Sequence, residues 1–552
     1  MRTRRLVKFE ALCSNTRKIT LLPKRYFVTI GPFPAVTPRV PQEPLAHDAL
    51  RLHHHAVGNH AASPASPAGA LTLESRLAEG LDPPPEVVLV ASDLHMGEGR
   101  DPVTGNYARS ESFFAGEAFA RWLAFHGADA ARGALLILNG DTFDFLRIVR
   151  VPVTDDDYRA WCRRLSERPE RAAPGSVDRH ERVFGLRTDD YKAVWKLHVM
   201  FTGHPDVFDA LARWLRAGGR VLLIKGNHDL ELHWAEVLRA LRAELGARVR
   251  RLGGDPAVTE RMVVARDSFV LENLYLEHGH RYEALTQVVG PAELPHRPGQ
   301  LTLPLGSFIN RYLINGIESA DPLLDNVRPV MQSLLALIRR HPGRVWTLYW
   351  RAWRFVGRAF RVWLAQLRAG RRPTPILPVL PMLLGLAAPH LVVTVIAVSL
   401  VRPALAGWIP RAARVGGSAL GLLAAVVLPC VIGALREMGR RIGLLPAGHQ
   451  RFDTAARSVL REWFGDAPAY PVVYAVMGHT HEQGVRRLGD RTLYVNAGTW
   501  IALWPDDRRE LAGRVLYSYI RFTRGGAAGY RHELLVWDDQ AGAPRGAQLM
   551  DA

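Results

Sequence analysis

Cysteine is scarce in this sequence. The chain of 552 residues has three cysteines, Cys13, Cys162 and Cys430, and one of them lies in an apolar segment. Three scattered cysteines do not form a disulfide framework and are typical of a reducing compartment. A secretory signal is also not expected, because no apolar core of about 7–15 residues follows the basic start of the chain.

Lysine is scarce as well, although the chain is strongly basic. The net charge is +18, and only six of the 71 lysine and arginine residues are lysine. The arginines gather near the N-terminus and beside the most apolar stretch of the chain. This distribution favours an anionic membrane surface over nucleic acid as the partner of the basic segments.

Five short motifs rich in Asp, His and Gly are spread between residues 93 and 481. They are Asp93-Leu94-His95, Gly140-Asp141-Thr142-Phe143-Asp144, Gly226-Asn227-His228-Asp229, His278-Gly279-His280 and Gly478-His479-Thr480-His481. Apolar runs at 87–90, 134–138, 221–224 and 472–476 precede four of them and predict strands buried on both faces. Because ligands bind at the carboxyl ends of strands in open α/β sheets, we expect the motifs to converge on one edge.

The residue types of these motifs suit a two-metal site. Carboxylates with imidazoles favour Mn²⁺, Fe or Zn²⁺ over Mg²⁺ and Ca²⁺, which prefer oxygen ligands alone. Two such ions about 3.5–4 Å apart clamp a phosphate, activate water and stabilise the leaving oxygen. Asp141 is the natural bridge, since a carboxylate has two oxygens and Gly140 leaves room beside it. Taken singly, the first motif is more typical of a strand end with a capping Asp, and the third of a turn.

With the complete set of motifs, the chain resembles the calcineurin-like metallophosphoesterase superfamily over roughly residues 86–300 and 466–540. The resemblance implies an α/β fold, a four-layer α/β/β/α sandwich. It also implies two divalent ions, with manganese the first choice and iron or zinc the alternatives. The implied ligands are Asp93, His95 and His481 for the first ion, Asn227, His278 and His479 for the second, and Asp141 as the bridge.

The resemblance further implies a catalytic pair outside the ligand set. His228 would protonate the leaving oxygen or stabilise the phosphate without binding metal, and Asp144 would orient it. A carboxylate in this position fixes the tautomer of the imidazole and raises its basicity.

Other histidines near the motifs have plainer interpretations. His280 is expected to be a neighbour of the site, because the family pattern favours the first histidine of its motif as the ligand. Glu231 and His233 are expected to be ordinary helix residues. The run His53-His54-His55 is interpreted as incidental.

The spacing of the motifs predicts one catalytic domain in two parts, although the length alone would allow three or four domains. A polar, mostly helical segment at 146–210 is expected to form a cap or edge insertion. The predicted organisation is a disordered leader or over-long start at 1–80, the first part of the domain at 86–300, a helical insertion at 301–373, a transmembrane hairpin at 374–435, a linker helix at 436–465, the second part at 466–540 and a tail at 541–552.

The hairpin is predicted from two charge-free stretches, 374–401 and 415–435. About 20 apolar residues span a hydrocarbon core, so both stretches qualify as transmembrane helices, with buried core helices as the alternative. Arginines on the outer flanks place the catalytic domain on the cytoplasmic side of the cell (inner) membrane by the positive-inside rule. Upstream, Trp346, Trp350, Trp353 and Phe360 share one face of a basic helix, which predicts an interfacial helix; packing on the domain is the alternative.

A metal centre held beside a bilayer predicts a lipid-linked phosphomonoester, phosphodiester or pyrophosphate as substrate, because confinement raises its effective concentration. The chain is similar here to the UDP-2,3-diacylglucosamine hydrolase-like branch, which has a helical lid in the corresponding gap. That branch has Gly-Asn-Arg-Asp where this chain has Gly226-Asn227-His228-Asp229, and its insertion is shorter. A nucleic-acid partner is not expected. The alternatives are a nuclease of the same superfamily and a membrane-anchored scaffold with a non-catalytic fold.

Overall fold

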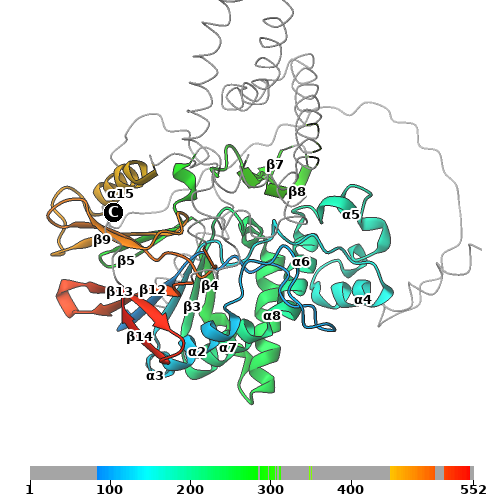
Figure 1. Ribbon diagram of the computed structural model, residues 1–552, viewed down its shortest axis with the longest axis horizontal. Helices are drawn as coiled ribbons and strands as arrows, with labels where there is room; N and C mark the ends of the chain where they lie inside the picture. The colour runs from blue at the N-terminus through cyan, green and yellow to red at the C-terminus, as the bar shows by residue number, and fades with distance from the viewer. Residues whose placement is uncertain are drawn as a thin grey trace, which may run out of the picture. The chain divides into compact units, whose positions relative to one another are not determined.

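A computed structural model describes residues 84–311 apart from 266, 284–285, 296, 305 and 308–309, the single positions 343, 347 and 350, and residues 448–503 and 515–547. Two mixed β-sheets form the centre of this part of the chain (Figure 1). The predicted leader 1–80 and most of the predicted insertion 301–373 lie outside the described residues.

The larger sheet has seven strands in the order β14-β13-β12-β1-β2-β3-β4. Its parallel half consists of β1 (Val87–Ala91), β2 (Leu135–Asn139), β3 (Arg220–Ile224) and β4 (Met262–Ala265). Its antiparallel half consists of β12 (Ser518–Arg524), β13 (Tyr530–Asp538) and β14 (Ala543–Gly546). Strand β14 therefore lies within the segment predicted as a tail.

The smaller sheet has five strands in the order β10-β11-β9-β6-β5. They are β5 (Ser268–Leu271), β6 (Leu274–Glu277), β9 (Val473–Met477), β10 (Gly484–Arg487) and β11 (Thr492–Asn496). The central strands β6, β9 and β11 run parallel, although β6 and β9 are far apart in the sequence. A short hairpin of β7 (Glu293–Leu294) and β8 (Arg297–Leu301) follows β5 and β6 in the chain.

The two sheets pack face to face through alternate residues of their strands. Val90, Ile137 and Ile224 of the larger sheet share one core with Leu276 and Val476 of the smaller sheet. All five residues of β1 are buried, as are all five of β2 and of β9. The strands predicted from the apolar runs are therefore confirmed, and burial on both faces explains why these runs do not alternate with polar residues.

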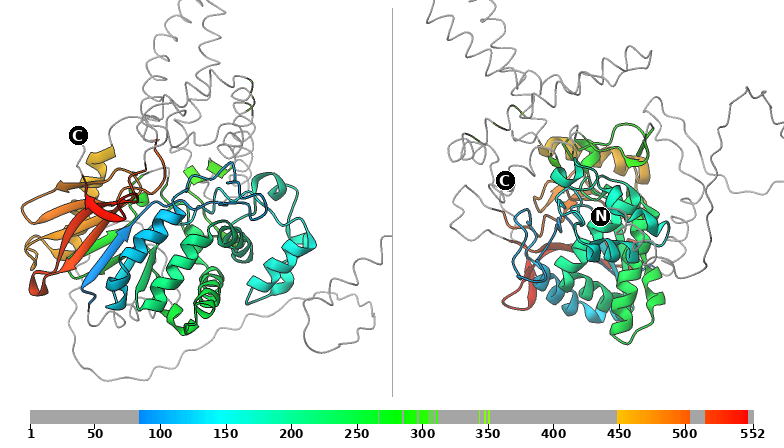
Figure 2. Two further views of the ribbon diagram at one scale, coloured as in Figure 1. Left: turned by 60° about the horizontal axis from the view of Figure 1, so that its bottom comes forward. Right: turned by 90° about the vertical axis from the view of Figure 1, so that its right-hand side faces the viewer.

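Helices cover the outer face of each sheet (Figure 1, Figure 2). On the smaller sheet, α15 (Gly448–Phe464) packs Phe452, Ala456 and Val459 against Tyr275 and Ala475. The helices on the side of the larger sheet are α2 (Gly116–Phe125), α3 (Gly127–Ala131), α6 (Asp190–Gly203), α7 (Pro205–Ala217) and α8 (Ala235–Arg251). The layers therefore run from helices through two sheets to a helix.

The segment between β2 and α6 folds into short helices. They are α4 (Asp155–Arg164), η2 (Pro169–Arg171), η3 (Pro174–Ser176) and α5 (Glu181–Phe184). The Thr154 side chain and Asp157 form a capping box that fixes the start of α4. The remaining 3-10 helices are η4 (Leu230–His233), η5 (Pro256–Arg261), η6 (His280–Tyr282) and η9 (Gly526–Ala528).

The predicted fold requires correction in its membrane part. Within the described ranges, no helix is both long and apolar enough to cross a bilayer, against the transmembrane hairpin of the prediction. The segment 374–435 that was assigned to the hairpin lies outside those ranges. A charge-free stretch of about 20 residues is long enough to span a bilayer, but a helix buried in a protein core can have the same length and composition. In the part of the chain that the structure describes, the architecture is the two-sheet domain with its covering helices.

Candidate metal centre

The predicted site residues lie directly after the carboxyl ends of five strands. Asp93 and His95 follow β1, Asp141 follows β2, and Asn227 and His228 follow β3. From the smaller sheet, His278 follows β6, and His479 and His481 follow β9. The face-to-face packing of the sheets brings both sets of loops together, as the distances below show. The expected convergence on one edge is found, but two sheets contribute to it.

The backbone of the site is locally strained. Eight non-glycine residues of the described ranges have positive φ, and five of them are predicted ligands: Asp93 (55°), His95 (50°), Asp141 (48°), His479 (70°) and His481 (62°). Each such residue costs on the order of 1–3 kcal/mol and persists only where surrounding contacts hold it.

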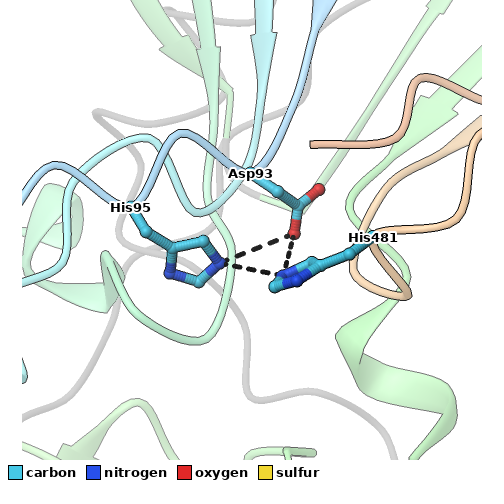
Figure 3. Close-up of side chains that lie close together, drawn as sticks. All are labelled: Asp93, His95 and His481. Atoms are coloured by element: carbon cyan, nitrogen blue, oxygen red, sulfur yellow. Dashed lines mark hydrogen bonds and ion pairs between the residues drawn. The ribbon is translucent and has the colours of Figure 1, made fainter. Parts of the chain in front are cut away.

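The first group contains Asp93, His95 and His481, whose possible ligand atoms all lie within 4.8 Å of one another. Figure 3 shows the three side chains converging on one point. His481 Nε2 lies 3.3 Å from Asp93 Oδ1 and 3.1 Å from His95 Nε2. Asp93 and His95 are buried. Three ligands in this arrangement can hold a metal ion.

The second group contains Asp141, His278 and His479, again within 4.8 Å. His278 Nδ1–H donates to the Asn139 carbonyl over 3.0 Å, which leaves Nε2 directed at Asp141 Oδ2, 3.1 Å away. The side-chain oxygen of Asn227 is buried and has no hydrogen-bond partner among the described residues. A buried orphan oxygen normally costs about 1–3 kcal/mol, and metal coordination would satisfy it.

Asp141 belongs to the second group and also lies near His95 of the first group. Its Oδ1 accepts a hydrogen bond from the His228 backbone N–H at 2.8 Å, and its Oδ2 lies 3.1 Å from His278 Nε2 and 3.8 Å from His95 Nε2. A single oxygen therefore faces both sides, rather than the two oxygens expected from the sequence. Two glycines make this approach possible, because a Cβ on Gly226 would lie 2.1 Å from Asp141 Oδ1 and one on Gly140 2.4 Å from the His278 ring.

The predicted catalytic pair is in contact. His228 Nδ1–H donates to Asp144 Oδ2 at 2.9 Å, which leaves Nε2 available to the site. The same oxygen lies 3.3 Å from His95 Nδ1 and 3.2 Å from Arg147 Nε. His228 also forms a group of possible ligands with His95 and Asp141. Its role as a proton donor rather than a ligand therefore stays a prediction.

The electrostatics of the cluster favour cations. Burial lowers the pKa of His95, but hydrogen bonds to Asp144 and Asp93 and the charge of Asp141 outweigh burial and raise it to about 10. Burial likewise lowers the pKa of His278, and the charges of Asp141 and Asp93 raise it to about 9. Burial raises the pKa values of Asp93 and Asp141, but the neighbouring histidines hold both well below the usual range. In the metal-free protein, protons on the imidazoles balance the carboxylates, and metal ions would replace them.

Several residues that hold the site were not predicted. Asp229 accepts hydrogen bonds from the backbone N–H groups of Thr142 and Gly226, at 2.9 and 2.6 Å, and so ties two motif loops together. Asn139 Nδ2 donates to the Glu277 carbonyl at 3.0 Å and links the two sheets. The only local signal was that Asp229 belongs to a motif, because the partners are distant in sequence.

The turns around the first group are held by residues outside the motifs. Buried Glu111 accepts from the Gly99 backbone N–H at 2.6 Å and from His204 Nε2–H at 3.1 Å. Thr499 Oγ1–H donates to the Asp93 carbonyl at 2.7 Å. These contacts fix the loop after β1 from two sides.

The other histidines and Glu231 are placed as follows. His280 has its ring centroid 5.6 Å from that of His278 and belongs to none of the ligand groups found in the described ranges. His233 Nε2 lies 3.8 Å from Glu293 Oε1. Glu231 differs from expectation, since it is buried in η4 and pairs with the buried Lys196 at 3.0 Å. The run at 53–55 lies outside the described residues.

No protein-family model matches this chain, and no curated protein matches it. What the structure establishes is that buried histidine and aspartate groups in it can hold a metal ion.

Proposed function

We propose that this protein is a dinuclear metal-dependent phosphoesterase of the calcineurin-like type. The observation that carries the proposal is the position of Asp141, which belongs both to a group with His278 and His479 and to a group containing His95. Because His95 is also part of the group with Asp93 and His481, the Asp141 carboxylate would connect two adjoining ion positions. Two ions that share a carboxylate are the arrangement used for in-line displacement at phosphorus.

The donor set supports transition metals. The two positions offer imidazole nitrogens, carboxylate oxygens and the amide oxygen of Asn227, which suits Mn²⁺, Fe or Zn²⁺. When bound, such ions polarise the phosphoryl oxygens and lower the pKa of water. We propose manganese as the first choice. Asp93, His95 and His481 would hold the first ion, Asn227, His278 and His479 the second, and Asp141 both.

The chain's own residues would handle the proton of the leaving group. His228 is 16% exposed, so its Nε2 is accessible from the site, and Asp144 holds its Nδ1. An imidazole held in this way can donate a proton to a departing oxygen, a contribution of roughly 10²–10⁴ in rate. The surrounding protein groups exclude water from the ligands, since Asp93, Asp141 and His278 are buried.

The substrate remains a prediction. The lipid-linked phosphoester, the bilayer as a partner and the inner-membrane localisation were argued from the apolar insertion, which lies outside the described residues. Monoesters, diesters and pyrophosphates share the same phosphorus chemistry, so the choice among them depends on contacts beyond the metal ligands. A direct comparison of simple esters is the first step.

The test is hydrolysis of bis-p-nitrophenyl phosphate and p-nitrophenyl phosphate by the full-length protein, with Mn²⁺ and with chelator. We expect cleavage that requires metal and is lost in Asp141→Asn. The matched control is Asp156→Asn, because the Asp156 side chain is 86% exposed on α4. Wild-type protein that binds no metal, or that cleaves neither ester with Mn²⁺, would contradict the proposal.

A further inference from the structure

The His479 side chain contacts two residues that lie outside the five motifs. Its Nε2 lies 3.2 Å from Glu283 Oε2 and 3.4 Å from Thr286 Oγ1. The Thr286 hydroxyl donates to the His280 carbonyl at 2.6 Å, so its oxygen is left as an acceptor. The Glu283 carboxylate oxygen that lies beside Nε2 is also an acceptor. Nε2 of His479 therefore carries the proton and donates it to these oxygens.

This tautomer decides which nitrogen of His479 is offered to the site. With the proton on Nε2, the lone pair is on Nδ1, and the imidazole can bind metal only through that atom. We propose that Glu283 is a positioning residue for the second ion, which holds His479 with Nδ1 directed toward Asp141 and His278. The inference rests on the proposed two-ion centre and adds a residue that orients one of its ligands.

The turn after β6 brings Glu283 to this place. Gly279 has φ of 102°, a conformation that turns the chain from β6 into η6, and Glu283 follows η6 directly. A Cβ on Gly279 would lie 3.3 Å from the Phe452 ring of α15, so a side chain there would crowd the helix. Gly279 therefore serves the turn that brings Glu283 to His479.

His479 is held from other directions too. Its backbone N–H donates to Asp93 Oδ2 at 3.0 Å, and the Phe452 ring lies 6.2 Å from its own ring. These contacts locate the backbone and one side of the ring, but they do not select a tautomer. Among the described residues, the partners of Nε2 are Glu283 and Thr286, and the carboxylate is the stronger acceptor.

A carboxylate that orients a metal-bound histidine has a measurable effect on the ion. Loss of such a partner typically weakens metal affinity about 10–100-fold. The pair is largely buried, with 10% of the His479 side chain and 24% of the Glu283 side chain exposed, so its loss also lowers stability. Glu283→Gln keeps an acceptor beside Nε2 and separates this cost from the weaker binding of one ion expected for Glu283→Ala.

The experiment is calorimetric titration of Mn²⁺ into metal-free, full-length wild type, Glu283→Gln, Glu283→Ala and the control Glu170→Ala. Glu170 is an exposed carboxylate of η2. For Glu283→Ala we expect one of two ions to bind about 10–100-fold more weakly, with the other unchanged. Glu283→Gln should fall between wild type and Glu283→Ala, because its amide oxygen still accepts from Nε2–H. The control should match wild type.

Three results would overturn the inference. Two ions bound normally by Glu283→Ala would show that Glu283 does not act on the site. A glutamine variant as weak as the alanine variant, with one ion lost outright, would make Glu283 a ligand instead of a positioning residue. Wild-type protein that fails to bind two ions would overturn the proposed function and this inference together, which separates that failure from the first two.

Discussion

The two sheets contribute to the metal centre in different ways. Loops of the larger sheet supply Asp93, His95, Asp141 and His228, and the two histidines among them share the carboxylate of Asp144. Loops of the smaller sheet supply His278, which is oriented by a backbone carbonyl, and His479, which is oriented by Glu283. In the proposed function, the larger sheet therefore links metal binding to proton transfer, whereas the smaller sheet supplies metal ligands alone. Asp141 belongs to the larger sheet but faces both sides.

The largest effect is expected from replacing Asp141, which faces both ion positions of the proposed centre. Asp141→Asn replaces the oxygen that lies 3.1 Å from His278 Nε2 and 3.8 Å from His95 Nε2 with a neutral amide. Both ions should bind at least about 100-fold more weakly, since loss of a ligand exceeds the cost of losing an outer partner. Metal content after dialysis and ester hydrolysis should fall together. If the variant keeps both ions, Asp141 is not the residue that bridges them.

His228→Ala isolates proton transfer on the larger sheet. We expect both ions to remain bound and turnover to fall about 10²–10⁴-fold. His233→Ala is the control, because His233 lies in η4 of the same loop and pairs with Glu293. Single-turnover rates and metal content are the measurements. Loss of metal from His228→Ala would assign His228 as a ligand instead.

Asp144→Asn tests whether the larger sheet links metal and proton transfer. His95 and His228 both lose a charged acceptor, so we expect the first ion to bind about 10–100-fold more weakly and turnover to fall as well. Glu283→Ala, in contrast, should weaken metal affinity without removing an acceptor from His228. Asp129→Asn is the matched control, because Asp129 pairs with His126 and Arg132 at 2.9 and 2.6 Å outside the ligand groups. The result that would count against the comparison is an Asp144→Asn variant with normal metal affinity.

The last prediction concerns the dependence of metal affinity on pH, which leaves every side chain in place. The pKa values of His95 and His278 are raised above 6.5, to about 10 and about 9, so both imidazoles are protonated at neutral pH without metal. Binding must release these protons, and affinity should rise about tenfold per pH unit for each proton displaced until pH passes these pKa values. Calorimetry in buffers of different ionisation enthalpy counts the protons. Asp144→Asn should reduce the release from His95, and pH-independent binding would contradict the prediction.

The motif residues and the strands before them were predictable because their signals are local. Continuous apolar runs of four or five residues followed by Gly, Asp or His need no knowledge of distant partners, and β1, β2, β3 and β9 lie where those runs are. The roles of Asp229, Glu111 and Glu283 were not predictable, since each is defined by contacts with other loops. The transmembrane hairpin was a prediction from composition alone, and composition sets a necessary condition for spanning, not a sufficient one.

The sequence by itself determined which side chains stand at the strand ends, because strand periodicity and the glycines of the turns are written into neighbouring residues. Only the tertiary structure decided that β6 and β9, separated by almost 200 positions, pair in parallel and carry His278 to within reach of His479. It also decided that one oxygen of Asp141 faces both sides and that Glu283 meets Nε2 of His479. Such contacts depend on how the two sheets pack. The burial of apolar faces drives that packing, but it is non-directional, so no short stretch of chain specifies its distant partner.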